Sequence, residues 1–230
     1  MNRTFDRVVQ FDERSRNYGI AEVLEAQKPR KRYWGHNTVI DQGREGACVG
    51  FAWTNELICN PRPHPDVPQY VGDAFARKIY KRAQQLDPWP GENYEGTSVL
   101  AGAKAIMETG YLTQYRWAFN IEQVRDAVIA EGPVILGINW YDSMYSTRPS
   151  GLVEVGGKVV GGHAIALTGY NPRARLKGEG GYKEVFRWKN SWGTSYGKNG
   201  TGYVKIEDLE RLLKEDGEAC IPMGRSLVRF

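Results

Sequence analysis

The chain has 230 residues, a length that fits one large domain or two packed halves and is enough to bury a sizeable core. Its net charge of +4 does not by itself indicate a nucleic-acid-binding protein, and its three cysteines are too few for a disulfide framework. No segment approaches the roughly 18 apolar residues of a membrane span, and the polar first residues lack the apolar stretch of a signal peptide. We therefore expect a soluble, cytoplasmic protein with free thiols.

The first part of the chain, residues 1–32, is polar and charged and has no strong hydrophobic period. We expect it to form an N-terminal arm with one short helix around residues 19–27. The basic run at residues 28–32 is typical of a solvated linker, although such runs also bind nucleic acid. No CxxC pair occurs, so no metal or other cofactor is expected, and neither nucleic acid nor a membrane is expected as a partner.

The chain becomes helical after Gly46. Four segments favour helices, most of them through apolar residues at three- and four-residue spacing: residues 47–60, 67–86, 97–110 and 120–132. Pro61 is expected to stop the first of these helices, and Gly110 is placed to terminate the third. Asn120 and Gln123 resemble a capping box at the start of the fourth.

The second half of the chain has a different character. Short segments rich in β-branched and aromatic residues predict strands at residues 133–140, 151–155, 158–170, 182–192 and 202–206. A short helix is expected at residues 206–217. Helices in the first half and an antiparallel sheet or barrel in the second indicate an α+β fold with two lobes side by side. We place the helical lobe at about 33–119 and the β lobe at about 120–230, with a site in the cleft between them.

Cys48 lies in the opening turn of the first strong helix, and Gly46 lets the backbone turn tightly just before it. The N-terminus of a helix carries positive partial charge, which stabilises a thiolate and lowers the pKa of the thiol. The position therefore favours a nucleophile. The alternative is a packing role, because free cysteine is among the residues most often buried.

His163 stands in an otherwise apolar strand, after two glycines that would let a substrate or another backbone approach closely. Asn190 follows at the end of the next strand and precedes Ser191 and Trp192. An asparagine carbonyl that accepts the imidazole N–H would fix the tautomer of the ring, and Trp192 would shield that hydrogen bond from water. Taken alone, His163 fits a structural core residue and Asn190 a turn.

Together these residues form a nucleophile, a base and an orienting group. Gln42 adds a fourth part, because its side-chain N–H and the backbone N–H of Cys48 could point at one oxygen and form an oxyanion hole.

The three segments QGREGACVGFA, GGHAIALTGY and KNSWGTSYGKNGTGYVKI resemble the motif blocks of papain-like cysteine peptidases, in the order of that family. The resemblance spans roughly Trp34 to Ile206. It implies the papain-like two-lobe fold over residues 33–230 and a peptide or protein substrate. It also implies Cys48 as nucleophile, His163 as general base and later acid, Asn190 as orienting residue and Gln42 as oxyanion donor.

The same resemblance extends to the substrate cleft. The segment EGTSVLAGAKAIMETGY resembles the one that follows the cleft glycine of the family, which implies that Gly96 hydrogen-bonds the substrate backbone. Val99 and Ala164 would help to line the pocket for the second residue before the scissile bond, and Trp192 is included among the substrate-binding residues. Thr97 stands where a second cleft glycine is common, which argues against close backbone pairing at that position.

Several positions depart from the family pattern. Glu45 replaces a cysteine that normally forms a disulfide, and Val49 replaces a tryptophan beside the nucleophile. The interval from Cys48 to His163 is shorter than usual, so the loops of the second lobe are expected to be trimmed. About 30 residues precede the matching region, too few for a full inhibitory prosegment. We expect either no autoinhibition or a short arm packed on the enzyme. By analogy the chain is like the compact members found in bacteria and their viruses.

The hypothesis is a cysteine endopeptidase that forms a thioester acyl-enzyme. Two alternatives use the same residues: a catalytically silent binding or scaffold protein with this fold, and an acyl transferase that uses the same thiol. Cys59 and Cys220 are expected to be inert, although a surface Cys220 would be able to link a dimer.

Overall fold

The fold comes from a computed structural model that describes residues 4–10, 13–35, 37–59, 71–87 and 95–225. The α-helices are α1 (Cys48–Cys59), α3 (Asp73–Leu86), α4 (Val99–Glu108), α5 (Ile121–Ala130) and α6 (Ile206–Lys214). The strands are β1 (Arg32–Tyr33), β2 (Leu112–Ala118), β3 (Val134–Tyr141), β4 (Val159–Ala174), β5 (Lys183–Lys189), β6 (Thr201–Lys205) and β7 (Glu218–Arg225). Three 3-10 helices are η1 (Glu13–Tyr18), η2 (Ile20–Glu22) and η3 (Asp142–Tyr145).

The predicted helices form, and their ends have the expected chemistry. The Asn120 side chain caps α5 by accepting a hydrogen bond from the backbone of Gln123 at 2.8 Å. Ser98 caps α4 in the same way, and Gly110 follows that helix with a positive φ of 76°. The second predicted helix begins at Asp73, after an extended Gly72, whereas residues 67–70 lie outside the described residues.

The antiparallel sheet has the strand order β2-β7-β3-β4-β5-β6, and β1 pairs with β4 off this path. β4 separates two cores because its side chains alternate between its faces. Ala164 and Ala166 pack in the core of α1, α3 and α4, whereas Ile165 and Leu167 pack in the core shared with α5 and α6. His163 directly precedes this stretch, and its ring lies against Trp140 and Trp192, which belong to the same core as Ile165 and Leu167.

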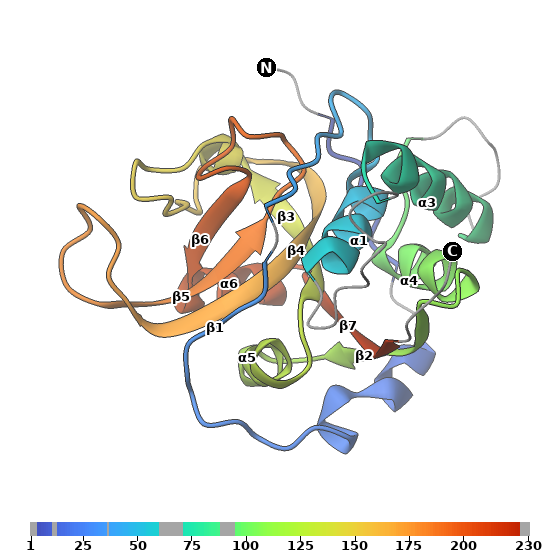
Figure 1. Ribbon diagram of the computed structural model, residues 1–230, viewed down its shortest axis with the longest axis horizontal. Helices are drawn as coiled ribbons and strands as arrows, with labels where there is room; N and C mark the ends of the chain where they lie inside the picture. The colour runs from blue at the N-terminus through green and yellow to red at the C-terminus, as the bar shows by residue number, and fades with distance from the viewer. Residues whose placement is uncertain (1–3, 11–12, 36, 60–70, 88–94, 226–230) are drawn as a thin grey trace.

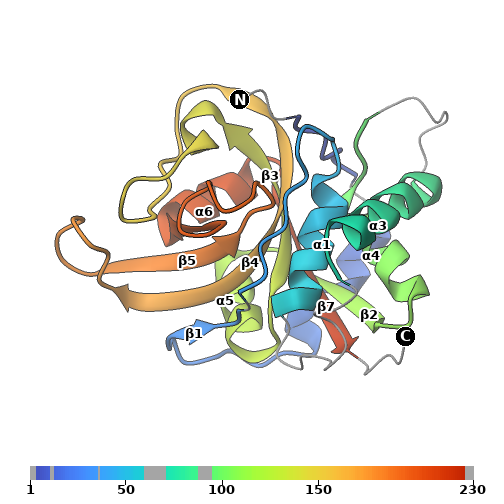
Figure 2. The ribbon, with the colours of Figure 1, turned by 45° about the horizontal axis from the view of Figure 1, so that its top comes forward.

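The overall arrangement confirms the predicted α+β organisation. Figure 1 shows α1 between the sheet on one side and α3 and α4 on the other, and Figure 2 shows the same order after a turn of the molecule. The division into an arm, a helical lobe and a β lobe at the stated boundaries stays a prediction. Among the described residues, no helix combines the length and apolar character needed to cross a membrane.

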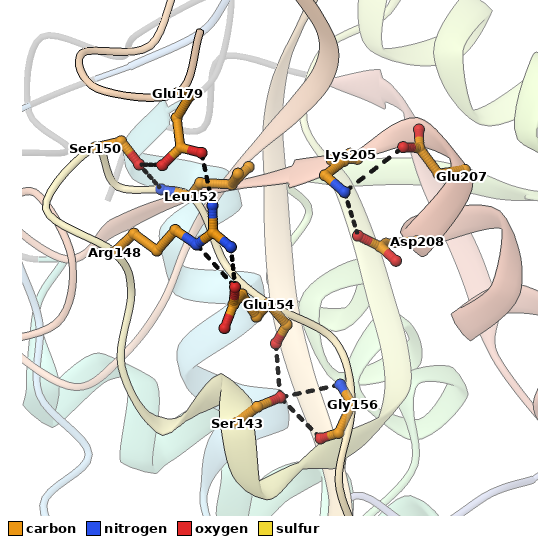
Figure 3. A network of polar contacts seen from close by, with 10 residues as sticks. All are labelled: Ser143, Arg148, Ser150, Leu152, Glu154, Gly156, Glu179, Lys205, Glu207 and Asp208. Carbon is orange, nitrogen blue, oxygen red and sulfur yellow. Dashed lines mark hydrogen bonds and ion pairs between the residues drawn. The ribbon is translucent and has the colours of Figure 1, made fainter.

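Residues 151–155 do not form the predicted strand: only Leu152 makes an isolated bridge, to Tyr203. The loop has two backbone hydrogen bonds to Tyr203, and side chains provide further contacts that Figure 3 shows. Arg148 pairs with Glu154 and, at 2.8 Å, with Glu179. The Ser143 hydroxyl donates to the carbonyl of Glu154 at 2.7 Å. Polar contacts thus satisfy a segment whose alternating residues resemble a strand.

Other elements differ from the sequence prediction. Of the short helix expected around residues 19–27, only the 3-10 turn η2 forms, and η1 precedes that range. Strands β1, β2 and β7 were not predicted. β7 lies between β2 and β3, so the last strand pairs with one from the first half of the chain. The separation of helices and strands between the halves is therefore incomplete.

Candidate active site

His163 and Asn190 meet as predicted. Nε2 of His163 and Oδ1 of Asn190 are 2.9 Å apart, and both residues are fully buried. The asparagine oxygen also accepts the backbone N–H of Ser191 at 2.8 Å, which holds the amide in this orientation. Because Oδ1 can only accept, the Nε2 atom must carry the proton, and Nδ1 is left as the basic nitrogen of the neutral ring.

Aromatic rings surround this pair. The Trp192 ring lies with its centroid 5.1 Å from that of His163, and Trp140 lies at 4.7 Å. Both tryptophans are buried, Trp192 at 3% exposure. The predicted shielding by Trp192 is therefore present, and water is kept away from the imidazole–amide hydrogen bond. A hydrogen bond in such surroundings is stronger than one exposed to solvent.

Gln42 is connected to the same segment through Ser191. The Ser191 hydroxyl donates to Oε1 of Gln42 at 2.6 Å, and the backbone N–H of Gln42 donates to the Ser191 carbonyl at 2.9 Å. The Gln42 amide nitrogen donates to the Glu45 carbonyl at 2.9 Å. These contacts orient the amide. The role of Ser191 was not predicted, although this residue lies directly after Asn190 in the third motif block.

Cys48 is the first residue of α1, as predicted. Its thiol is hydrogen-bonded to the backbone of Ala164, the residue after His163, and to the backbone of Asp6. The expected low pKa is not found in this conformation. Burial raises the pKa of the Cys48 thiol to about 11, and it outweighs the two backbone hydrogen bonds, which favour the thiolate. The thiol is therefore neutral while the residue remains covered.

The cover is a part of the N-terminal arm that we call the cleft segment, residues 4–8. Its backbone pairs with both walls of the cleft. The N–H of Arg7 donates to the Gly162 carbonyl at 2.9 Å on one wall. On the other wall, the N–H of Thr97 donates to the Asp6 carbonyl at 3.1 Å, and that of Val8 donates to the Thr97 carbonyl at 3.0 Å.

The Phe5 ring extends this cover to the histidine. Its centroid lies 5.8 Å from that of His163, 5.6 Å from that of Trp192 and 5.3 Å from that of Tyr145. Tyr145 is the last residue of η3. The cleft segment therefore occupies the space over the thiol and the imidazole together. The arm therefore packs on the rest of the protein, which was one of the two expectations for it.

Glycines allow this close approach. A Cβ at Gly96 would lie 1.9 Å from the carbonyl oxygen of Asp6, and one at Gly46 would lie 2.0 Å from its carboxylate. Beside His163, a Cβ at Gly161 would lie 2.4 Å from Cβ of Phe5, and one at Gly162 would lie 2.4 Å from the carbonyl oxygen of Arg7. The two glycines before His163 do let another backbone approach, and that backbone is the arm.

The cleft residues Gly96 and Thr97 contact different groups in this conformation, and the hydrogen bond of Gly96 to a substrate stays a prediction. The N–H of Gly96 donates to the Tyr80 hydroxyl at 2.9 Å, and it is Thr97 that pairs with the cleft segment. Thr97 therefore forms close backbone pairs with the arm, contrary to the prediction. The reason is the direction of the threonine side chain, whose hydroxyl donates to Asp87 at 2.7 Å.

Val99 and Ala164 are buried beside this groove, at 0% and 1% exposure. Val99 is the first residue of α4, and Ala164 lies in β4. Their role toward a substrate stays a prediction.

None of the three cysteines forms a disulfide, and Glu45 makes an ion pair instead. Cys48, Cys59 and Cys220 are free and buried, so the idea of a dimer linked through a surface Cys220 is wrong. Cys220 lies inside β7, between β2 and β3, and its side chain packs in the core shared with α1, α3 and α4. Glu45 forms an ion pair of 2.6 Å with Arg77, which connects the loop before Cys48 to α3.

Comparisons with known proteins agree with this site. The family described as papain family cysteine protease matches residues 77–220, which include His163 and Asn190 and begin after Gln42 and Cys48. The chain is 28% identical over 174 residues to cathepsin B-like cysteine proteinase 4 of Caenorhabditis elegans, covering 71% of this chain and 45% of that protein. It is 21% identical over 207 residues to the uncharacterized peptidase C1-like protein L477 of Acanthamoeba polyphaga mimivirus. The chain thus spans 45% and 62% of the length of these two relatives.

Solved structures show the same fold. Xylellain, a cysteine protease from Xylella fastidiosa, has a TM-score of 0.71 at 17% identity, with 99% of this chain and 97% of that chain covered. The bromelain protease from Ananas comosus in complex with the E64 inhibitor has a TM-score of 0.56 at 16% identity, with 85% and 99% covered. The fold is therefore papain-like, and since the family match extends over more than half of the sequence, this chain belongs to the papain family of cysteine proteases.

Proposed function

We propose that the chain is a cysteine endopeptidase in which Cys48 is the nucleophile, His163 the general base and then acid, and Asn190 the residue that orients the imidazole. The observation that carries this proposal is the buried contact of 2.9 Å between His163 and Asn190. It lies next to Ala164, whose backbone is hydrogen-bonded to the Cys48 sulfur. Peptides and proteins are the substrate class.

In the proposed acylation step, the Cys48 proton passes to Nδ1 of His163 while the sulfur forms a bond to the peptide carbonyl carbon. The carbonyl oxygen becomes an oxyanion that accepts hydrogen bonds from the Gln42 amide and the Cys48 backbone N–H. The C–N bond then breaks, and His163 gives its proton to the leaving amine. A thioester remains on Cys48.

Deacylation uses the same residues in reverse roles. Water attacks the thioester carbon and loses a proton to His163, the C–S bond breaks, and the departing sulfur takes that proton. The acid product leaves and the thiol is restored. Both steps need the cleft segment to move, because it covers the sulfur and holds the thiol neutral. We therefore propose that the described conformation is a self-blocked state.

The covered thiol also favours a second candidate, a catalytically silent protein that keeps the fold. The two are separated by mixing the chain with an unstructured peptide and analysing the products by mass spectrometry. The peptidase predicts cleavage by the natural chain and none by Cys48→Ala, with the folded far-UV circular dichroism spectrum retained.

A peptidyl epoxide provides a measurement that needs no turnover. It should alkylate Cys48 in the natural chain and leave Cys59 and Cys220 unmodified. Cleavage that persists in Cys48→Ala would refute the assignment of the nucleophile. Absence of both cleavage and alkylation in the natural chain and in Arg7→Ala, whose arm is held less tightly, would support the silent protein.

A further inference from the structure

The Arg7 side chain enters a buried pocket beside the thiol. Its guanidinium donates to Oε1 of Glu218 from Nε at 3.1 Å and from Nη2 at 3.0 Å, and Nη2 also donates to the Asp216 carbonyl at 2.9 Å. The arginine side chain has no exposed surface, and that of Glu218 is 15% exposed. Two opposite charges that are removed from water in this way stabilise each other only while both are present.

The floor of this pocket comes from three neighbouring strands. Ala164 of β4 lies opposite Gly137 of β3, which in turn lies opposite Glu218 of β7. Residues directly opposite one another in an antiparallel sheet point to the same face, so Ala164 and Glu218 flank the position at which Gly137 has no side chain. A Cβ at Gly137 would lie 2.5 Å from Nε of Arg7 and 2.7 Å from Oε1 of Glu218. The space above this glycine is filled by the arginine.

The pocket opens at the position where a substrate backbone would lie. Arg7 is bound through its N–H to Gly162, and the residue before it, Asp6, is hydrogen-bonded to the Cys48 sulfur. A side chain that enters this pocket therefore comes from a residue close to the scissile bond. Ala164 on the floor is one of the two residues that the family resemblance links to the second residue before that bond.

We infer that Glu218 makes this pocket selective for a basic side chain, arginine in particular, at the second residue before the scissile bond of the substrate. The inference rests on the proposed peptidase function. Arg7 of the arm then occupies the place of the preferred substrate side chain. Arginine fits because its planar guanidinium presents several donors at once, and here two of them reach one carboxylate oxygen while one also reaches a backbone carbonyl.

The burial of Glu218 supports the need for a cationic partner. It raises the pKa of the Glu218 carboxyl, and the charge of Arg7 opposes this shift. When the cleft segment leaves, the Glu218 carboxylate loses this partner. A substrate arginine restores the ion pair, whereas a neutral side chain leaves the carboxylate without it.

The test compares two fluorogenic peptides that differ only at this residue, one with arginine and one with citrulline, which has the same shape and no charge. The measured quantity is the ratio of their kcat/KM values on the full chain. It does not depend on how often the arm leaves the cleft, because that fraction scales both rates equally. We expect arginine to be favoured about 10- to 100-fold, as is typical of hydrogen bonds between charged groups.

The variant Glu218→Gln should reduce this ratio to about one, because the substrate arginine then loses its charged partner. The matched control is Glu215→Gln, because Glu215 is a nearby carboxylate that accepts from the Tyr141 hydroxyl at 2.6 Å instead. It should leave the ratio unchanged. Gly137→Ala places a methyl group in the space that the substrate side chain would fill, and it should reduce turnover of both peptides. Circular dichroism checks that this variant folds.

Turnover with an unchanged ratio in Glu218→Gln would overturn the inference and leave the peptidase function intact. The variant Arg7→Ala weakens the hold of the arm and should raise both rates by the same factor. Absence of turnover and of epoxide labelling in the natural chain and in Arg7→Ala would overturn the proposed function, and this inference with it.

Discussion

At the scale of single residues, the site depends on hydrogen bonds that orient its side chains. The side-chain oxygen of Asn190 pairs with the His163 imidazole and also accepts the backbone N–H of Ser191. The Ser191 hydroxyl donates to the side-chain oxygen of Gln42. One serine therefore connects the group that orients the base with the proposed oxyanion donor. Its contacts are buried, so water does not replace them when they are lost.

This connection predicts graded effects on rate. Gln42→Ala should lower kcat about 10²- to 10³-fold, as expected for one donor of an oxyanion hole. Ser191→Ala should lower kcat by about 10-fold with little change in KM, because one orienting hydrogen bond is lost. The double variant should be no slower than Gln42→Ala, since both changes act through the same amide. Steady-state kinetics measure all three.

Ser195→Ala is the control, because this serine lies in the same motif and its hydroxyl contacts only the Trp192 carbonyl among the hydrogen bonds seen, at 3.4 Å. It should have the activity of the natural chain. Strictly multiplicative losses in the double variant would show that Ser191 acts independently of Gln42.

At the scale of elements, the cleft segment behaves as a docked strand whose attachment depends on a carboxyl. Burial, together with the neighbouring Glu95, raises the pKa of Asp6 to about 6. Cys48 and Tyr80 also lie near this carboxyl. The docked state therefore favours the protonated acid, and the stabilisation that protonation provides is complete below the ordinary pKa of 3.8 and is lost as pH rises through about 6.

We therefore predict that the arm is held more tightly at pH 4.5 than at pH 7. Hydrogen exchange of the Arg7 and Val8 amides, corrected for the intrinsic effect of pH, should show greater protection at the lower pH. The measurement is best made in Cys48→Ala, so that titration of the thiol does not contribute. Asp6→Asn should remove most of the difference. Equal protection at both values in the chain with Asp6 would contradict the prediction.

At the scale of the whole molecule, a buried ion pair connects the helical part to the sheet. Arg225 at the end of β7 donates to Glu56 of α1 at 2.8 Å, with side-chain exposures of 6% and 0%. The same guanidinium donates to the carbonyls of Glu131 at 2.9 Å and of Pro133 at 3.4 Å. Helix α1, strand β7 and the turn between α5 and β3 are thus joined at one point.

Removal of one partner should destabilise the fold strongly. Glu56→Ala leaves the Arg225 charge buried without its carboxylate, and we expect the free energy of unfolding to fall by about 3–5 kcal/mol. Replacement of both residues by apolar side chains of similar size, Glu56→Leu with Arg225→Met, should cost much less. Urea denaturation measures both. A double variant as unstable as Glu56→Ala would mean that the pair stabilises the fold beyond mutual neutralisation.

The sequence by itself was enough to predict the type of fold and to single out the residues that the proposed reaction uses. Cys48 at the start of a helix, His163 in an apolar strand and Asn190 at the end of the next are local signals, because their chemistry depends on the element that carries them. The helices were predictable for the same reason, since their apolar spacing and caps lie within a few residues of one another. β2 and β7 escaped prediction because their pairing joins residues more than 100 positions apart.

Only the tertiary structure decided what fills the cleft. Arg7 and Glu218 are 211 positions apart, and no spacing or motif relates them. No motif relates Asp6 to Cys48 either. Burial raises the pKa of the Cys48 thiol, whereas the helix N-terminus alone would lower it. Helix caps and motif residues act over one turn or one strand, whereas burial and charge pairing depend on every segment that packs nearby, and these segments meet only when the chain is folded.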